Sequence, residues 1–178
     1  MPGINIGGRN INNLRYADDT VLLVEDVNKL QDIVDHVKEN SLDKGLKMNT
    51  SKTKVMVLSR KPDKIMNVKI ECVQLEQVSP YKYLGHKVVN LGSCKEEVKT
   101  RIAIARKRFI ELKSILTCDH MQISTRTRIL KCYVHSVLLY GSETWTLNKE
   151  LERKINAFEM WPIRRMGRIS WKDKKTNK

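Results

Sequence analysis

The sequence predicts an α+β protein in which a mixed half, residues 1–90, precedes an all-α half, residues 91–178. Short runs of alternating or β-branched residues, separated by turn residues, are typical of strands and occupy the first half. From Ser93 onward, apolar residues recur at steps of three and four, which is the spacing of a helix face. Apolar residues make up 40% of the 178-residue chain, which is enough for a hydrophobic core.

An acidic turn lies between two extended runs near the start of the chain. Residues 11–16 and 20–24 are rich in strand-forming types, so they predict a hairpin whose second strand is largely buried. Asp is a standard turn residue, and Asp18 and Asp19 fall between the two runs. The two carboxylates are therefore expected at the tip of the hairpin, and Tyr16 is expected on a half-buried strand.

A helix is expected after this hairpin. Leu30, Ile33, Val34 and Val37 share one helical face, and acidic residues precede them, where negative charge suits a helix N-terminus. Gly45 is a typical residue for the end of such a helix. Short strands are predicted at residues 46–49, 54–58 and 68–73, and residues 81–89 are predicted to be extended.

The second half predicts three helices. The first follows Ser93 and carries a narrow apolar seam, formed by Val98, Ile102, Ala105, Phe109, Leu112 and Leu116. The second is expected at about residues 124–140, before Gly141, and the third begins at Asn148 as its N-cap. Pro162 is expected to kink or restart the third helix, because proline lacks an N–H group. The Lys-rich tail after Trp171 is expected to be disordered.

Positive charge is concentrated in the second half. The chain carries 34 Lys and Arg against 20 Asp and Glu, a formal net charge of +14. Residues 81–178 account for +13 of this charge and residues 1–80 for +1. A one-sided basic excess favours a polyanion as partner, and a solvated basic surface is the alternative. Trp161 lies among these basic residues, where a core role is favoured over base stacking.

A row of cations follows one flank of the first helix of this half. At about 100° per residue, four of them fall together beside the apolar seam: Lys95, Lys99, Arg106 and Lys113. Arg101 and Arg108 fall on the opposite flank. The row is suited to phosphate contacts, which are independent of base sequence.

Several classes of protein are disfavoured. No window approaches the ~18 consecutive apolar residues of a membrane span, so no membrane partner is expected. The N-terminus lacks the basic and apolar regions of a secretory signal, and the four Cys are widely spaced. The protein is therefore expected to be intracellular, in the nucleus or the cytoplasm, and not secreted.

Two neighbouring carboxylates at the tip of a hairpin are electrostatically costly. Their repulsion favours a bound cation between or beside them. Mg²⁺ suits such a place, because it needs only one or two carboxylates besides water and substrate phosphates. An ordinary Asp-rich turn is the alternative, and the flanking residues decide between the two.

Those flanking residues resemble a known family. Residues 14–23, Leu-Arg-Tyr-Ala-Asp-Asp-Thr-Val-Leu-Leu, closely resemble the catalytic aspartate hairpin of reverse transcriptases, in particular those of non-LTR (LINE-type) retrotransposons. Three later segments are similar to the same family in the same order. Residues 45–54 are similar to the next palm motif, Tyr83-Leu84-Gly85 to the primer-grip strand, and residues 138–145 to a stretch in or beyond the thumb.

The resemblance implies the end of a polymerase palm at residues 1–90, with an antiparallel sheet and a packed helix, and a basic thumb-like region at residues 91–178. It implies RNA-directed DNA synthesis, in which two Mg²⁺ ions clamp the reacting oxygens of primer and dNTP. Asp18 and Asp19 correspond to catalytic, metal-binding carboxylates. Lys52 corresponds to a catalytic lysine near the pyrophosphate, a role for which Lys54 is the alternative.

The same resemblance assigns partners to the rest of the chain. Tyr83, Leu84 and Gly85 correspond to the primer grip. The thumb-like helix tracks a duplex of RNA template and DNA primer, so the contacts fall to Lys95, Lys99, Arg106 and Lys113.

The two-metal site needs a further carboxylate, which in the family lies well before the hairpin. Residues 1–17 contain no Asp or Glu, and Glu25 and Asp26 would lie some 20 Å from the tip at ~3.3 Å per residue. We therefore expect the C-terminal part of a reverse transcriptase, with weak Mg²⁺ binding and little or no activity alone. A non-catalytic nucleic-acid-binding protein and a structural remnant of an element are the alternatives.

Overall fold

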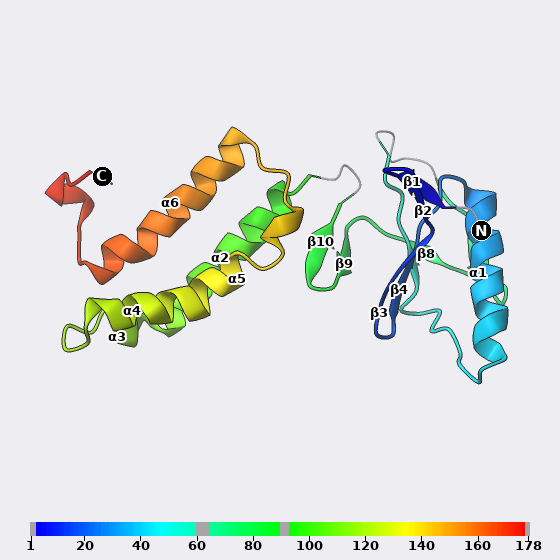
Figure 1. Ribbon diagram of the computed structural model, residues 1–178, viewed down its shortest axis with the longest axis horizontal. Coiled ribbons are helices and arrows are strands. Elements are labelled where there is room, and N and C mark those ends of the chain that lie inside the picture. Colours follow the sequence, from blue (N-terminus) through cyan, green and yellow to red (C-terminus); the bar gives the residue numbers. More distant parts are fainter. Residues whose placement is uncertain (1–2, 60–64, 90–92, 177–178) are drawn as a thin grey trace. The chain divides into compact units, whose positions relative to one another are not determined.

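Two compact units make up the structure, a computed structural model that describes residues 3–59, 65–89 and 93–176. The units are Met1–Tyr81, which mixes strands with one helix, and Lys82–Lys178, which is mostly helical (Figure 1). This mixture of helix and sheet agrees with the predicted class. The boundary expected between residues 90 and 91 lies outside the described residues, and the compact units divide after Tyr81.

The strands of the N-terminal unit form separate pairs. Three pairings are antiparallel, namely β1 (Ile4–Ile6) with β2 (Arg9–Ile11), β3 (Asn13–Tyr16) with β4 (Asp19–Leu22), and β6 (Lys69–Ile70) with β7 (Val73–Gln74). A fourth pairing, of β5 (Lys54–Val55) with β8 (Glu76–Gln77), is parallel. The described strands thus give small two-stranded sheets instead of the single antiparallel sheet expected, because strands of two to four residues offer few ladder hydrogen bonds.

Helix α1 (Val27–Leu42) follows the hairpin as predicted. The carboxylate of Asp26 caps it by accepting a hydrogen bond from the Asn28 backbone N–H at 2.7 Å. Gly45 follows the end of the helix with a φ of 72°, which glycine adopts without steric cost. The apolar face of α1 contributes to the buried core of this unit, which comprises Val34, Val55, Val68, Ile70 and Leu75.

The C-terminal unit begins within a short hairpin, and helices follow it. Strands β9 (Tyr81–Tyr83) and β10 (His86–Val88) pair with each other, and the turn between them is Leu84–Gly85. Both turn residues have positive φ, 46° and 82°, so the stretch predicted to be extended reverses direction. The helical elements are α2 (Lys95–Glu111), α3 (Lys113–Leu116), α4 (Ile123–Leu130), the π-helix η1 (Lys131–His135), α5 (Ser136–Leu138), η2 (Ser142–Thr144), α6 (Lys149–Met166) and η3 (Trp171–Asp173).

The apolar seam of the first long helix is confirmed as the centre of the second core. Val98, Ala105, Phe109 and Leu116 are fully buried, although the chain is divided between α2 and α3 at Leu112. Trp161 of α6 packs edge-to-face on Phe109, with ring centroids 4.9 Å apart, as a core residue would. None of the described helices has the length and apolar content of a membrane span.

Two expectations about the C-terminal helix and tail differ from the structure. α6 begins after Asn148, whose side chain caps Leu151 N–H at 2.9 Å, and then continues through the buried Pro162 to Met166 without a break. Beyond α6, the stretch predicted to be disordered contains the 3-10 helix η3. Arg164 of α6 donates a hydrogen bond to the backbone oxygen of Lys175 at 3.0 Å, which fixes part of this segment.

Candidate metal-binding hairpin and nucleic-acid interface

The acidic pair lies at the turn of the β3–β4 hairpin. Tyr16 and Asp19 face each other as the last register pair, so Ala17 and Asp18 form the turn itself. Ala17 has a φ of 51°, a conformation that costs a residue with a Cβ some stability. Asp18 therefore lies at the hairpin tip, as predicted, whereas Asp19 is the first residue of β4. Both residues are exposed.

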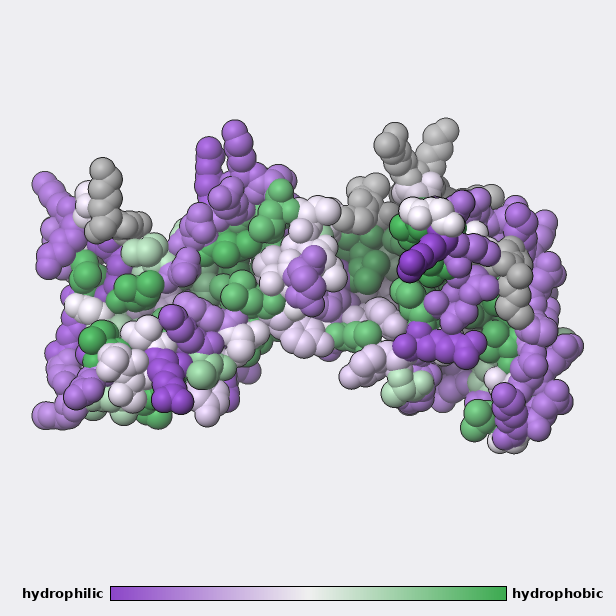
Figure 2. Space-filling model, viewed as in Figure 1, coloured by the Kyte–Doolittle hydropathy of each residue, from purple (hydrophilic) through white to green (hydrophobic). Residues whose placement is uncertain are grey.

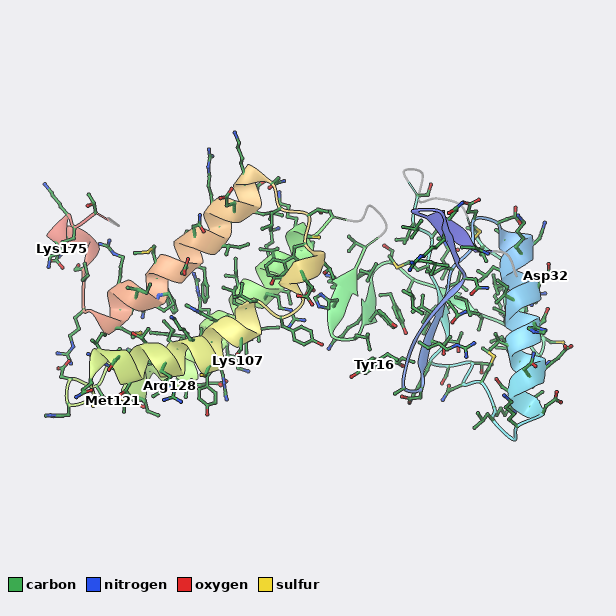
Figure 3. All side chains as sticks on the ribbon, viewed as in Figure 1. Tyr16, Asp32, Lys107, Met121, Arg128 and Lys175 are labelled. Atoms are coloured by element: carbon green, nitrogen blue, oxygen red, sulfur yellow. The ribbon has the colours of Figure 1, made fainter. Side chains whose placement is uncertain are left out.

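The hairpin is less buried than the sequence predicts. Tyr16 is 65% exposed and Leu14 45% exposed, and Figure 3 shows the Tyr16 side chain projecting from the hairpin. Along the second strand, residues 19 and 20 are exposed and residues 21–24 only half-buried. The expected burial is wrong because β3 and β4 form a two-stranded sheet on their own in the described part of the chain.

The donor chemistry of the hairpin fits Mg²⁺ in part. Asp18 and Asp19 supply two neighbouring carboxylates that are open to solvent, which matches the preference of Mg²⁺ for oxygen ligands and retained water. Within residues 3–59, 65–89 and 93–176, no three His, Cys, Asp or Glu side chains gather as a complete metal site. The hairpin therefore offers part of a coordination sphere, to which a substrate or another carboxylate must add.

The two candidate lysines have different surroundings. Lys54 Nζ lies 2.5 Å from Glu76 Oε2, across the parallel β5–β8 pair, so its ammonium is already paired. Lys52 is exposed and belongs to a turn in which Asn49 Oδ1 accepts its backbone N–H at 3.1 Å. Among the described ion pairs, none joins Lys52 to Asp18 or Asp19. Of the two lysines, only Lys52 keeps an ammonium without a described ion pair.

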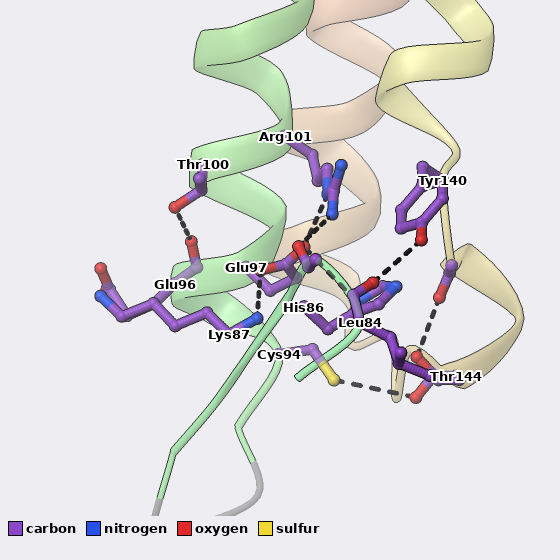
Figure 4. Close-up of polar contacts among 12 residues, drawn as sticks. Leu84, His86, Lys87, Cys94, Glu96, Glu97, Thr100, Arg101, Tyr140 and Thr144 are labelled. Carbon is purple, nitrogen blue, oxygen red and sulfur yellow. Dashed lines mark hydrogen bonds and ion pairs between the residues drawn. The ribbon is translucent and has the colours of Figure 1, made fainter. Parts of the chain in front are cut away.

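The primer-grip candidates form a turn that helical residues hold. Arg101 Nη2 donates a hydrogen bond to Gly85 O at 2.5 Å, and the Tyr140 hydroxyl donates one to Leu84 O at 2.9 Å (Figure 4). Tyr83 is half-buried on the preceding strand. The motif around Leu84 and the motif around Tyr140 are 56 residues apart in sequence, and the structure brings them into direct contact.

A buried ion pair supports this contact. Glu97 is 5% exposed and Arg101 9% exposed, with Arg101 Nε 2.6 Å from Glu97 Oε1. Glu97 Oε2 also accepts the backbone N–H of Lys87 at 2.9 Å, which ties β10 to α2. The helical spacing placed Arg101 on the flank opposite the row of cations, and the structure buries it there against Glu97. The available signal was the i, i+4 spacing of Glu97 and Arg101 on one helix.

The predicted row of cations is exposed, and most of its members have partners within the unit. Lys95 Nζ lies 3.3 Å from Glu150 Oε1, and Lys99 Nζ lies 2.8 Å from Glu96 Oε1. The guanidinium of Arg106 stacks over the Trp161 ring at 5.1 Å. Lys113 is exposed as well. Such exposed contacts stabilise the fold little, so the cations can exchange them for phosphate groups.

The electrostatics around Glu96 reveal a cation that sequence reasoning missed. The hydrogen bond from Lys99 lowers the pKa of the Glu96 carboxyl below its usual value, and Lys87 and Lys95 add to this shift. Lys87 belongs to β10, and it joins the cations of α2 because the hairpin folds back onto that helix. Only the tertiary structure brings these three lysines together.

Two shallow grooves on the C-terminal unit are lined by cations. The first, of about 530 Å³, follows α2, where Figure 3 shows Lys107, and its lining combines cations with apolar residues: Lys99, Arg106, Lys107, Ile102 and Ile110. The second, of about 360 Å³, lies near the end of α6 and is lined by Lys113, Arg164, Arg165 and Arg168. Figure 2 shows hydrophobic residues among hydrophilic ones on one face of the C-terminal unit. The lining of the first groove, which combines cations with apolar residues, suits sugar-phosphate and base contacts.

Comparisons with known proteins agree with the resemblance of the sequence. Residues 4–88 match the family model described as reverse transcriptase (RNA-dependent DNA polymerase). A protein of Caenorhabditis elegans, described as transposon-derived and uncharacterized, is 31% identical over 155 residues, which cover 85% of this chain and 55% of that relative. No solved structure matches the chain significantly. The chain is thus similar to reverse transcriptases over the segment that carries the acidic hairpin, and to a transposon-derived protein over most of its length.

Proposed function

We propose that the chain is the palm-end and thumb-like part of an RNA-directed DNA polymerase of a non-LTR (LINE-type) retrotransposon, acting in the nucleus or cytoplasm. One observation carries the proposal. Two neighbouring, exposed carboxylates, Asp18 and Asp19, lie at the turn of a hairpin inside the segment that matches reverse transcriptases. The chain spans 55% of its transposon-derived relative, so the proposal assigns polymerase activity to a longer protein.

The proposed roles of the hairpin residues follow from their chemistry. Mg²⁺, when bound, would neutralise phosphate charge and favour attack by the primer 3′-hydroxyl. Asp18 and Asp19 would hold it through their carboxylate oxygens, together with a further carboxylate that lies well before the hairpin in the longer protein. Lys52, which is exposed, would offer its ammonium to the leaving pyrophosphate of the dNTP, whereas Lys54 remains paired with Glu76.

The proposed role of the C-terminal unit is to hold the duplex of RNA template and DNA primer. Its row of exposed cations lies along α2 and reaches α3: Lys95, Lys99, Arg106 and Lys113. The Leu84–Gly85 turn would lie beside the primer. Lysine and arginine contacts to phosphates are sequence-independent and release counterions, so affinity must fall steeply with salt.

A non-catalytic nucleic-acid-binding protein is the second candidate. The observation that favours it is the charge distribution, since residues 81–178 carry +13, while among the described residues the two carboxylates of the acidic hairpin gather no further metal ligands. Under this alternative, duplex binding depends on the C-terminal cations and is indifferent to divalent cations and to Asp18 and Asp19.

Site-directed oxidative cleavage tests the metal site. Fe²⁺ replaces Mg²⁺ at oxygen-ligand sites and, with ascorbate and peroxide, cuts the backbone beside them. We expect cleavage near Asp18 that excess Mg²⁺ suppresses and that Asp18→Asn/Asp19→Asn abolishes. The matched control is Glu25→Gln/Asp26→Asn, which neutralises another adjacent acidic pair and keeps a helix cap. Equal cleavage in the Asp18/Asp19 variant and in the native chain would contradict the assignment.

Fluorescence anisotropy with a labelled RNA–DNA duplex tests the grip. Each of Lys99→Ala and Lys113→Ala is expected to weaken binding and to reduce the slope of log K against log salt by about 1. Lys44→Ala, at an exposed lysine after α1, is the control and is expected to bind like the native chain. If the three variants behave alike, the row of cations is a solvated surface.

Primer extension tests the assignment of Asp18 as a catalytic residue. With an RNA template and Mg²⁺ or Mn²⁺, the chain alone is expected to extend the primer weakly or not at all. Any extension that is seen should disappear in Asp18→Ala. Extension that survives this substitution would contradict the assignment of the catalytic aspartate.

A further inference from the structure

The contact between the β9–β10 turn and the helices is organised by residues from two separate stretches. We name it the turn joint and define it by Leu84, Gly85, His86, Glu97, Arg101 and Tyr140 (Figure 4). All six residues belong to the C-terminal unit. Neither the acidic hairpin nor the row of cations gives the joint a role in binding nucleic acid. Any such role must follow from the contacts of the joint itself.

Tyr140 is the centre of the joint. Its hydroxyl donates to Leu84 O at 2.9 Å, its ring stacks on His86 with centroids 5.3 Å apart, and the Arg101 guanidinium lies 4.5 Å from the ring centre. The next residue, Gly141, has a φ of 70°, and a Cβ there would overlap the His86 ring. The sequence Tyr-Gly is therefore what allows the turn to lie against the helices.

Glu97 and Arg101 complete the joint from α2. Arg101 bridges Glu97 and the backbone oxygen of Gly85, and Glu97 binds the Lys87 backbone N–H. These contacts fix the backbone of β10 next to the first turns of α2. They therefore hold the backbone of Lys87 against Glu97, which lies two residues from both Lys95 and Lys99 on α2. The lowered pKa of Glu96, to which all three lysines contribute, agrees with this placement.

We propose that Lys87 is a further phosphate-binding residue and that Tyr140 and Arg101 are its positioning residues. The turn joint holds the hairpin on α2, so that Lys87 from β10 and Lys95 and Lys99 from α2 form one cationic cluster for the backbone of a nucleic-acid duplex. The inference rests on the proposed function, because it assumes that the C-terminal unit binds a duplex.

A double-mutant cycle on the full chain tests this inference, with anisotropy of a labelled RNA–DNA duplex over a range of salt. We expect Lys87→Ala to weaken binding about three- to tenfold and to reduce the salt slope by about 1. Tyr140→Phe removes one hydrogen bond and keeps the ring stack. In the Tyr140→Phe background, the effect of Lys87→Ala is expected to shrink, because the turn loses one of its contacts with the helices and holds Lys87 less firmly.

Tyr133→Phe is the matched control, since it removes an exposed tyrosine hydroxyl from another helical segment of the same unit. In that background, the effect of Lys87→Ala should stay at its native size. Thermal unfolding of every variant, followed by circular dichroism, ensures that folded proteins are compared. Gly141→Ala provides a second disturbance of the joint, and it is expected to reduce the contribution of Lys87 as Tyr140→Phe does.

The outcomes separate the inference from the function on which it rests. If the native chain does not bind the duplex, both the proposed function and the inference are wrong. If the native chain binds and Lys87→Ala leaves affinity and salt slope unchanged, only the inference is wrong. If Lys87→Ala has the same effect in native and Tyr140→Phe backgrounds, Lys87 binds phosphate but the positioning role of the joint is overturned.

Discussion

Glu97 and Arg101 form a buried ion pair within one helix, with side chains only 6% and 11% exposed and 2.6 Å between Arg101 Nε and Glu97 Oε1. Removing one partner leaves the other charge buried without its ion-pair partner. Arg101→Met is therefore expected to lower the free energy of unfolding by about 3–5 kcal/mol. Glu97→Leu/Arg101→Met removes both charges and is expected to restore much of this loss. Urea unfolding followed by helical circular dichroism measures both variants.

An exposed ion pair on the same helix is the control for this prediction. Arg108 Nη1 lies 2.8 Å from Glu111 Oε2, with both side chains nearly half exposed. Water and salt screen such a pair, so Arg108→Ala is expected to change the free energy of unfolding by less than about 1 kcal/mol. Equal losses for Arg101→Met and Arg108→Ala would contradict the special importance of burial.

Local patterns predicted much of this structure because local physics determines it. The apolar seam from Val98 to Leu116, the Asn148 cap and the hairpin at Asp18 each depend on residues within a few positions of one another. A helix face, a capping side chain and an acidic turn have signatures of that length. These elements were accordingly predictable to within a residue or two.

The turn joint was not predictable, because its contacts span long stretches of chain. Tyr140 and Leu84 are 56 residues apart, and Arg101 and Gly85 are 16 apart. Helical spacing alone placed Arg101 on one flank of the apolar seam, and it does not reveal the hairpin that folds onto that flank. The same limit applies to Lys87, which reaches the cations of α2 only through tertiary contacts. The acidic hairpin, in contrast, was expected to be more buried than it is, because strand patterns do not reveal how many strands pair.

Ala17 gives a prediction for the acidic hairpin. Its φ of 51° lies in the left-handed region, which disfavours a branched Cβ most strongly. Ala17→Val is expected to lower the free energy of unfolding of the N-terminal unit by about 1–2 kcal/mol. Ala17→Gly relieves the steric cost and adds flexibility to the unfolded chain, so a net change within about 1 kcal/mol is expected. Denaturant unfolding measures the stability of both variants. An Ala17→Val variant that is more stable than the native protein would contradict the turn geometry.

Asn148 gives a prediction for the last long helix. Its side chain accepts the Leu151 N–H at 2.9 Å and satisfies one of the otherwise unpaired donors at the start of α6. Asn148→Ala is expected to lower the free energy of unfolding by about 1 kcal/mol, whereas Asn148→Asp keeps the cap and is expected to be nearly neutral. Thermal and urea unfolding test the pair, and the cap assignment fails if both variants lose stability equally.

His135 gives a prediction for the dependence of stability on pH. Burial lowers the pKa of His135 below 6.5, Lys131 acts in the same direction and Glu159 opposes them, and Nε2 has no hydrogen-bond partner in the described part of the chain. The folded state therefore favours the neutral imidazole, and the unfolded chain takes up a proton first as pH falls. The contribution of His135 to stability is fully present above about pH 6.5 and is lost as pH falls from there through the folded-state pKa.

His135→Leu removes both the titration and the unpaired nitrogen. The variant is expected to lose the part of the pH dependence below about 6.5 that His135 causes, and to be at least as stable as the native protein at acidic pH. His120→Leu, at an exposed histidine of the same unit, is the control and should keep the native pH profile. Urea unfolding about one pH unit on either side of 6.5 measures the difference. An unchanged profile in His135→Leu would contradict this assignment and show that another group controls acid stability.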